Sequence, residues 1–74
     1  MLSKEELSKS IGSKVRQFRN EKRISMETLA FDSGIEFRQL GRIERGEINT
    51  TIFSLYRIAF ALEVNICDII DISH

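Results

Sequence analysis

The chain has 74 residues, of which 42% are hydrophobic and 30% charged, and it contains no proline. This composition is typical of one compact, helix-rich domain and excludes a disordered tail; a core of this size often gains stability from self-association. Eleven basic residues balance eleven acidic ones, which excludes an overall basic character. The charged residues are unevenly distributed along the chain. Residues 1–46 hold ten Lys and Arg and seven Asp and Glu, whereas residues 47–74 hold one basic and four acidic residues.

The cysteine and histidine content excludes several kinds of site. Cys67 is the only cysteine and cannot form an internal disulfide, and with His74 as the only histidine no metal site of ordinary spacing can be assembled. Nucleophilic or acid-base catalysis needs a positioned constellation that these residues do not supply. We therefore expect no metal, no cofactor, no small-molecule ligand and no enzymatic activity. No apolar run is long enough to span a bilayer, so the expected location is the cytoplasm.

The first predicted helix runs from about Lys4 to Lys22. Ser3 and Glu6 form a capping-box signature at its start, and apolar residues then recur every three or four positions. This apolar stripe consists of Leu7, Ile11, Val15 and Phe18. Gly12 lies inside the pattern, so the sequence leaves open a kink or a separate N-terminal turn at that point.

A short second helix is predicted over residues 26–33. Ser25 is its N-cap, Leu29 and Ala30 face inward, and Gly34 can adopt the left-handed turn that ends it. Only about three residues separate this helix from the next, and such a connection is typical of a helix-turn-helix.

The third helix lies between the glycines of the stretch Gly34–Gly46. Leu40 and Ile43 lie on one face, with Ile35 just before them, while polar side chains occupy the remaining arc. These polar residues are Arg38, Gln39, Arg42 and Arg45. An arginine fork can pair with the guanine acceptors in a DNA major groove, and glutamine suits adenine. The alternative for this arc alone is a solvated helix surface.

A polar loop over residues 47–50 precedes the fourth helix, predicted from about Thr51 to Leu62 with Asn49 or Thr50 as its cap. Its apolar residues form a core stripe and a second ridge, so two neighbours are expected, the domain core and a partner chain. The stripe is Ile52, Leu55, Ile58, Ala59 and Leu62, and the ridge is Phe53, Tyr56 and Phe60.

Asn65 is the predicted cap of a short fifth helix. A β-strand over residues 66–72 is the alternative, because β-branched residues favour strands, but no second strand is available to pair with it. The C-terminal third holds more apolar residues than one small core needs, which predicts a dimer surface of which some members must be core. The candidates are Phe60, Val64, Ile66, Ile69, Ile70 and Ile72.

With these elements placed, residues 11–70 resemble the Cro and phage-repressor type of helix-turn-helix domain, also called the xenobiotic-response-element family. The resemblance is carried by Ile11-Gly12, Val15-Arg16-Gln17-Phe18-Arg19, Ser25, Leu29-Ala30, Gly34-Ile35, Ile43-Glu44-Arg45-Gly46, Asn49, Leu55, Ile58-Ala59, Ala61-Leu62 and Val64.

The resemblance implies an all-α, five-helix, lambda-repressor-like DNA-binding domain over residues 11–72, with residues 1–10 as a helical extension of its first helix. Helices 2 and 3 would form the helix-turn-helix, with the recognition helix at about residues 36–45. Such a domain binds a pseudo-palindromic operator in double-stranded DNA as a homodimer and regulates transcription. A small repressor or a restriction-modification controller, encoded by a bacterium or phage and associated with the nucleoid, fits this size.

The resemblance also implies roles for individual residues. Base edges would be contacted by Phe37, Arg38, Gln39 and Arg42. The DNA backbone would be contacted by Arg45, Ser25, Met26, Arg16 and Asn49. Arg19 and Glu44 would form an internal ion pair.

Three departures from the family pattern keep a second function class in view. Met26 stands where relatives usually carry glutamine, Glu36 stands where they usually carry a Ser or Thr cap, and Phe37 can offer only apolar contact. Together with the zero net charge, these departures favour the alternative of a protein-interaction module that binds another regulator.

Overall fold

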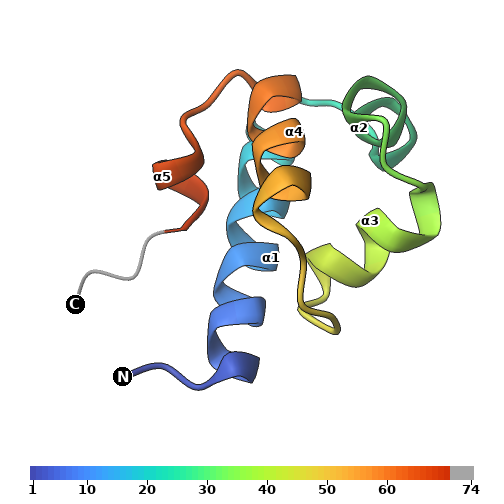
Figure 1. Cartoon of the computed structure of the whole chain (residues 1–74). Coiled ribbons are helices and arrows are strands. Elements are labelled where there is room, and N and C mark those ends of the chain that lie inside the picture. The colour runs from blue at the N-terminus through green and yellow to red at the C-terminus, as the bar shows by residue number, and fades with distance from the viewer. Residues whose placement is uncertain (71–74) are drawn as a thin grey trace.

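The computed structural model describes residues 1–70, and this part of the chain contains helices and no strands. Figure 1 shows them in chain order: α1 (Lys4–Glu21), α2 (Met26–Ser33), α3 (Phe37–Glu44), α4 (Ile52–Leu62) and α5 (Ile66–Ile69). The predicted all-α, five-helix fold is confirmed. Residues 66–69 are helical, so the strand alternative is wrong there, while Ile72 and His74 lie outside the described residues.

α1 begins with the predicted capping box. The Ser3 hydroxyl accepts from the Glu6 backbone N–H at 3.1 Å, and the Glu6 carboxylate accepts from the Ser3 N–H at 2.9 Å. The helix continues through Gly12, which is buried where α1 crosses the end of α3. A Cβ at Gly12 would lie 2.7 Å from the carbonyl oxygen of Glu44 and closer still to that of Ile43. This glycine therefore serves a close helix contact and not a kink.

The turn between α2 and α3 is fixed from both sides. Ser25 caps α2, with its hydroxyl accepting from the Thr28 N–H at 3.0 Å, and Gly34 ends the helix in the left-handed region at φ +72°. From α4, the Arg57 side chain donates to the carbonyl oxygen of Ser33 at 2.8 Å and also to that of Gly34. Arg57 thus holds the turn that positions α3.

α4 begins one residue later than predicted. Its cap is Thr51, whose hydroxyl accepts from the Ser54 N–H at 3.0 Å, so the assignment to Asn49 or Thr50 is wrong. Ile52 therefore occupies the first helical position and is exposed, which corrects its placement in the core stripe. The other four members of that stripe are buried: Leu55, Ile58, Ala59 and Leu62.

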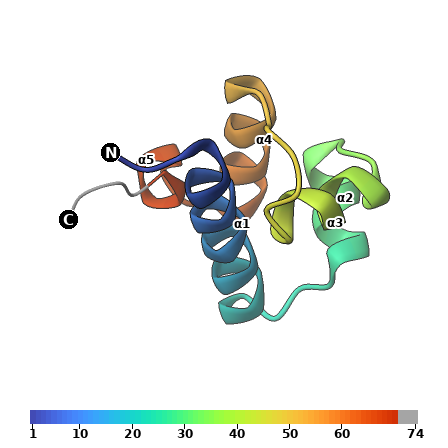
Figure 2. The ribbon, with the colours of Figure 1, turned by 90° about the horizontal axis from the view of Figure 1, so that it is seen from below.

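The core draws on all five helices and on Ile35 of the α2–α3 turn. α1 and α4 lie side by side through its centre, with α2 and α3 on one side and α5 on the other (Figures 1 and 2). Ile69 of α5 is fully buried in this core, so among the candidates for a dimer surface it is one of those that belong to the core. No helix within residues 1–70 combines the length and hydropathy that crossing a bilayer requires.

Candidate DNA-binding face

α3 presents two different faces. Leu40, Ile43 and Glu44 are buried, whereas Arg38 and Arg42 are exposed and Gln39 is half-buried. These last three side chains line one shallow hollow, together with Glu36 and Ile48. The structure therefore brings together three of the four residues expected to contact bases. Phe37, at the first position of α3, is half exposed and is not part of the lining of this hollow.

The buried face of α3 ends in an ion pair with α1. The Arg19 guanidinium donates to both carboxylate oxygens of Glu44, from Nε at 2.8 Å and from Nη2 at 3.1 Å. The Glu44 side chain is only 1% exposed and that of Arg19 is 14% exposed. A carboxylate at the C-terminal end of α3 opposes the helix dipole, so the arginine stabilises it there. The pair fixes α3 to α1 from behind and leaves the outer face free.

Arg16 lies beside this pair at the surface. Its Nε is 3.5 Å from the Glu44 carboxylate, and its side chain is half exposed. It is therefore anchored on the inner side while its remaining N–H groups can reach a phosphate.

Arg45 follows directly after α3 and is already paired in the isolated chain. Its guanidinium donates to Glu47 twice, at 2.7 Å from Nε and at 3.4 Å from Nη2. These hydrogen bonds hold the pKa of Glu47 below its ordinary value and raise that of Arg45. Glu47 was not expected as part of the site, because the two residues meet only through the backbone turn at Gly46. Any phosphate that binds Arg45 has to compete with this carboxylate.

The other expected backbone contacts lie at two places. Ser25 is exposed at the start of α2, next to Met26, whose half-buried side chain packs against the core and α3. A thioether donates no hydrogen bond, so a Met26 contact with phosphate is restricted to its backbone N–H. Asn49 is exposed in the loop after α3, with its side-chain oxygen 3.5 Å from the Ser8 hydroxyl of α1.

Glu36, which precedes α3, makes no side-chain capping hydrogen bond. Its carboxylate therefore lies in the lining of the hollow beside the arginines and contributes negative charge there.

Within residues 1–70 no group of three His, Cys, Asp or Glu side chains is placed to hold a metal ion.

A helix-turn-helix family model matches residues 15–69, which is most of the chain. The chain belongs to the Cro and phage-repressor type of helix-turn-helix family. The predicted resemblance is thereby confirmed, and as a member of this family of DNA-binding transcription regulators the chain is not an enzyme.

Individual relatives agree with the family assignment. An HTH-type transcriptional regulator from Sinorhizobium fredii is 35% identical over 60 residues, which are 81% of this chain and 78% of the relative. The structure of the restriction-modification controller protein C.AhdI from Aeromonas hydrophila gives a TM-score of 0.82 at 32% identity, covering 84% of this chain and 94% of that one. The clp gene regulator ClgR from Corynebacterium glutamicum gives 0.81 at 27% identity, covering 85% and 82%.

Proposed function

We propose that this chain binds a pseudo-palindromic operator as a homodimer, with α3 of each copy in a major groove, and regulates transcription there. The observation that carries the proposal is the division of α3. Glu44 is fixed to Arg19 at the back, while Arg38 and Arg42 extend from the exposed face. The likeness to a restriction-modification controller protein and to other regulators supports the same reading.

Base recognition is assigned to the outer side chains of α3. Arg38 and Arg42 have the planar fork that pairs with guanine O6 and N7, and Gln39 can donate to and accept from adenine. Phe37 offers an apolar contact to a thymine methyl group.

Phosphate contacts are assigned around α3. The first backbone N–H groups of α2, at Met26 and its neighbour, have no partner within the helix and lie at the positive end of its dipole. Ser25 is exposed beside them, and Arg16, Arg45 and Asn49 supply further donors. Together these groups would orient α3 in the groove without reading sequence.

The regulatory input is the concentration of the protein itself. Only a dimer spans two half-sites about 34 Å apart, so weak dimerisation turns a modest rise in expression into a steep rise in operator occupancy. Such a protein acts where the DNA is, on the nucleoid in the cytoplasm of a bacterium.

Binding of the purified protein to its own upstream DNA tests this proposal. The upstream duplex and a scrambled duplex of equal length are titrated over a salt series with wild type, Arg42→Ala and Lys14→Ala. Lys14 is two positions from Gly12 and thus turned by about 200° from the side of α1 that meets α3, so it controls for the loss of one charge. We expect Arg42→Ala to weaken binding to the upstream duplex by about 1–3 kcal/mol and Lys14→Ala to leave the preference for it unchanged.

Equal and weak binding of both duplexes, unaffected by Arg42→Ala, would contradict the proposal. The protein-interaction module would then be the better reading, and the exposed aromatic residues would be the surface to examine.

A further inference from the structure

α4 carries a row of aromatic rings that no other part of residues 1–70 covers. We call Phe53, Tyr56 and Phe60 the aromatic ridge; they are 64%, 53% and 73% exposed. Neighbouring ring centroids lie 6.4 Å and 6.3 Å apart, so the three rings form one continuous surface. The residues follow each other at three and four positions, which places them along one side of the helix.

The ridge is large for a chain of this size. At about 150–250 Å² for a whole aromatic side chain, its exposed fractions amount to roughly 300–500 Å². The largest apolar patch on a typical monomer is of this order and is often functional. A stable interface needs about 800 Å² on each partner, and the ridge would supply roughly half of it as an apolar centre.

The guanidinium next to the ridge is hydrogen-bonded within the chain. Arg57 turns towards α2, where its Nε donates to the Ser33 carbonyl oxygen at 2.8 Å, and its guanidinium carbon lies 5.4 Å from the centre of the Phe53 ring. The ridge itself has no formal charge. Two identical ridges can therefore meet through uncharged aromatic rings.

We propose that a second copy of this chain covers the ridge, in an isologous interface whose two-fold axis passes beside Tyr56. The inference rests on the proposed function, and it places the homodimer on α4, where Phe60 was among the predicted candidates. The candidates that follow α4 are poorer surfaces, because Val64, Ile66 and Ile70 are half-buried against the core of their own chain.

The spacing of the ridge residues is suited to such a symmetry. When two α4 helices run antiparallel, Tyr56 meets the partner's Tyr56 and Phe53 meets the partner's Phe60. The antiparallel direction also brings Glu63, at the C-terminal end of α4, near the N-terminal end of the second α4, where the helix dipole favours an acid. A parallel arrangement would instead place like charges together.

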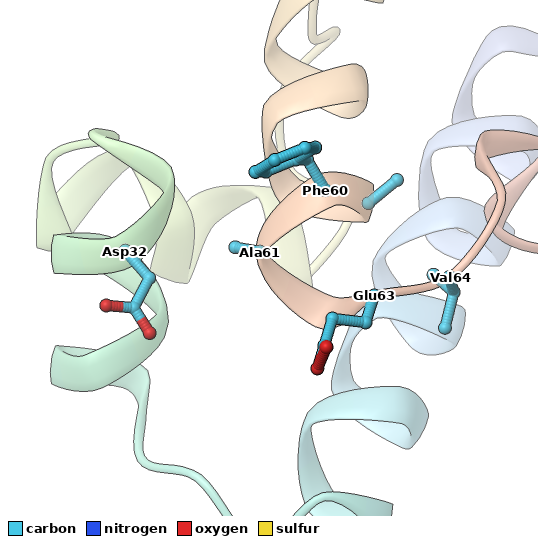
Figure 3. A pocket seen from close by; sticks show the side chains of 6 residues that line it. Asp32, Phe60, Ala61, Glu63 and Val64 are labelled. Carbon is cyan, nitrogen blue, oxygen red and sulfur yellow. The ribbon is translucent and has the colours of Figure 1, made fainter.

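The groove beside the ridge extends the same surface. Phe60 lies over the gap between α4 and α2, with Asp32 of α2 across from it and Val64 at the end of α4 (Figure 3). This groove is mainly apolar, with acidic side chains at its rim. It provides room for the part of a second copy that overhangs the ridge.

The ridge and the proposed DNA-binding face are carried by different helices. In the view from below, α4 stands at the upper edge of the molecule, with α1, α2 and α3 beneath it (Figure 2). α3 packs mainly against α1 and α2. The ridge and the outer face of α3 therefore belong to different helices and share no residue.

The test measures the mass of the DNA-free protein by light scattering and sedimentation over a concentration series. Tyr56→Glu and Tyr56→Lys are compared with wild type and with Phe31→Glu, a matched control because Phe31 is an 87% exposed phenylalanine on α2. Circular dichroism checks that each variant keeps its helices. We expect each Tyr56 variant to raise the dimer dissociation constant by roughly 30-fold or more, and Phe31→Glu to leave it unchanged.

Mixing the two Tyr56 variants locates the axis. If Tyr56 meets the partner's Tyr56, each variant alone sets like charges against each other, and a one-to-one mixture pairs opposite charges and restores the dimer. Unchanged dimerisation of both folded variants, a mixture that stays monomeric, or a monomeric wild type at every concentration would overturn the proposal. Mass is measured without DNA, so a dimer on the ridge that fails to prefer operator DNA would refute only the proposed function.

Discussion

Two arginines near α3 have opposite environments. Arg19 is largely buried and donates to Glu44 and also, from Nη1 at 3.1 Å, to the carbonyl oxygen of Ile24. Arg45 is half exposed and is paired only with the equally exposed Glu47. Removing one partner of a buried pair destabilises the fold because the other charge is left buried and unpaired. An exposed pair exchanges easily with solvent or a ligand. Arg19 is therefore structural and Arg45 is available to DNA.

Removing one member of the buried pair should destabilise the protein strongly. We expect Glu44→Ala to lower the free energy of unfolding by about 3–5 kcal/mol, because Arg19 is left without its carboxylate. Urea denaturation of Glu44→Ala, Arg19→Ala and the double variant measures the coupling. The double variant should lose clearly less unfolding free energy than the sum of the losses in the two single variants. If the losses in unfolding free energy were additive, the two residues would not act as a coupled pair.

Freeing Arg45 should strengthen binding to DNA of any sequence. We expect Glu47→Gln to raise the affinity for a scrambled duplex roughly two- to fivefold, because the phosphate no longer competes with a carboxylate. Fluorescence titration against Glu21→Gln, an exposed acid at the end of α1, separates this release from the general effect of losing one acid. Equal effects of the two variants on DNA affinity would mean that pairing with Glu47 does not weaken the binding of Arg45 to phosphate.

At the scale of the helices, the contact between α1 and α3 depends on Gly12. Its Cα faces the last backbone carbonyls of α3, and it brings the two helix axes close enough for Arg19 to reach Glu44. Helix propensity alone would favour alanine at this position by about 1 kcal/mol. The packing requirement opposes that preference.

Alanine at this position should therefore destabilise the protein despite its better propensity. We expect Gly12→Ala to lower the melting temperature, with a loss of about 1–3 kcal/mol, because the new methyl group meets backbone atoms that cannot move aside. Ser13→Ala, at the exposed neighbouring position, should be neutral or slightly stabilising. If both variants had the same unfolding free energy, the close contact at Gly12 would not determine which residue is tolerated there.

Much of this helical arrangement could be predicted from the sequence, since caps and apolar periodicity are local signals. The bounds of α2 and the capping box of α1 are examples. The cap of α4 could not be chosen from residue type, because Asn49, Thr50 and Thr51 can all cap; in the structure the Thr51 hydroxyl accepts from the Ser54 N–H. The role of Gly12 was left open for the same reason, because a glycine in a helix permits either a kink or a close approach.

In the candidate site, the exposed and buried faces of α3 could be predicted from the spacing of its apolar residues. The Arg19–Glu44 pair could be predicted from the family resemblance. Arg57 was missed because its partners, the carbonyls of Ser33 and Gly34, are brought to it only by tertiary packing. The pairing of Arg45 with Glu47 depends on the backbone turn after α3. Sequence periodicity carries no signal for such contacts.

For the whole molecule, basic and acidic residues are unevenly distributed along the chain. The basic residues gather in the part of the chain that contains α3, and the acidic excess lies in residues 47–74. This polarity would orient the protein on DNA, with the acidic part directed away, although the zero net charge limits non-specific attraction. In the proposed function, specific recognition therefore rests on base contacts made by two α3 helices held in a dimer.

Selection of binding sites from a library of random-sequence duplexes tests this claim most directly, with wild type and Arg42→Ala run in parallel. The wild type should enrich two inverted half-sites whose centres lie about one helical turn, roughly 34–36 Å, or a multiple of it apart. Arg42→Ala should relax the preference at the same base pair in both half-sites and keep their spacing. Enrichment of no sequence, of a single half-site without symmetry, or of the same sequence by both proteins would contradict operator reading by α3.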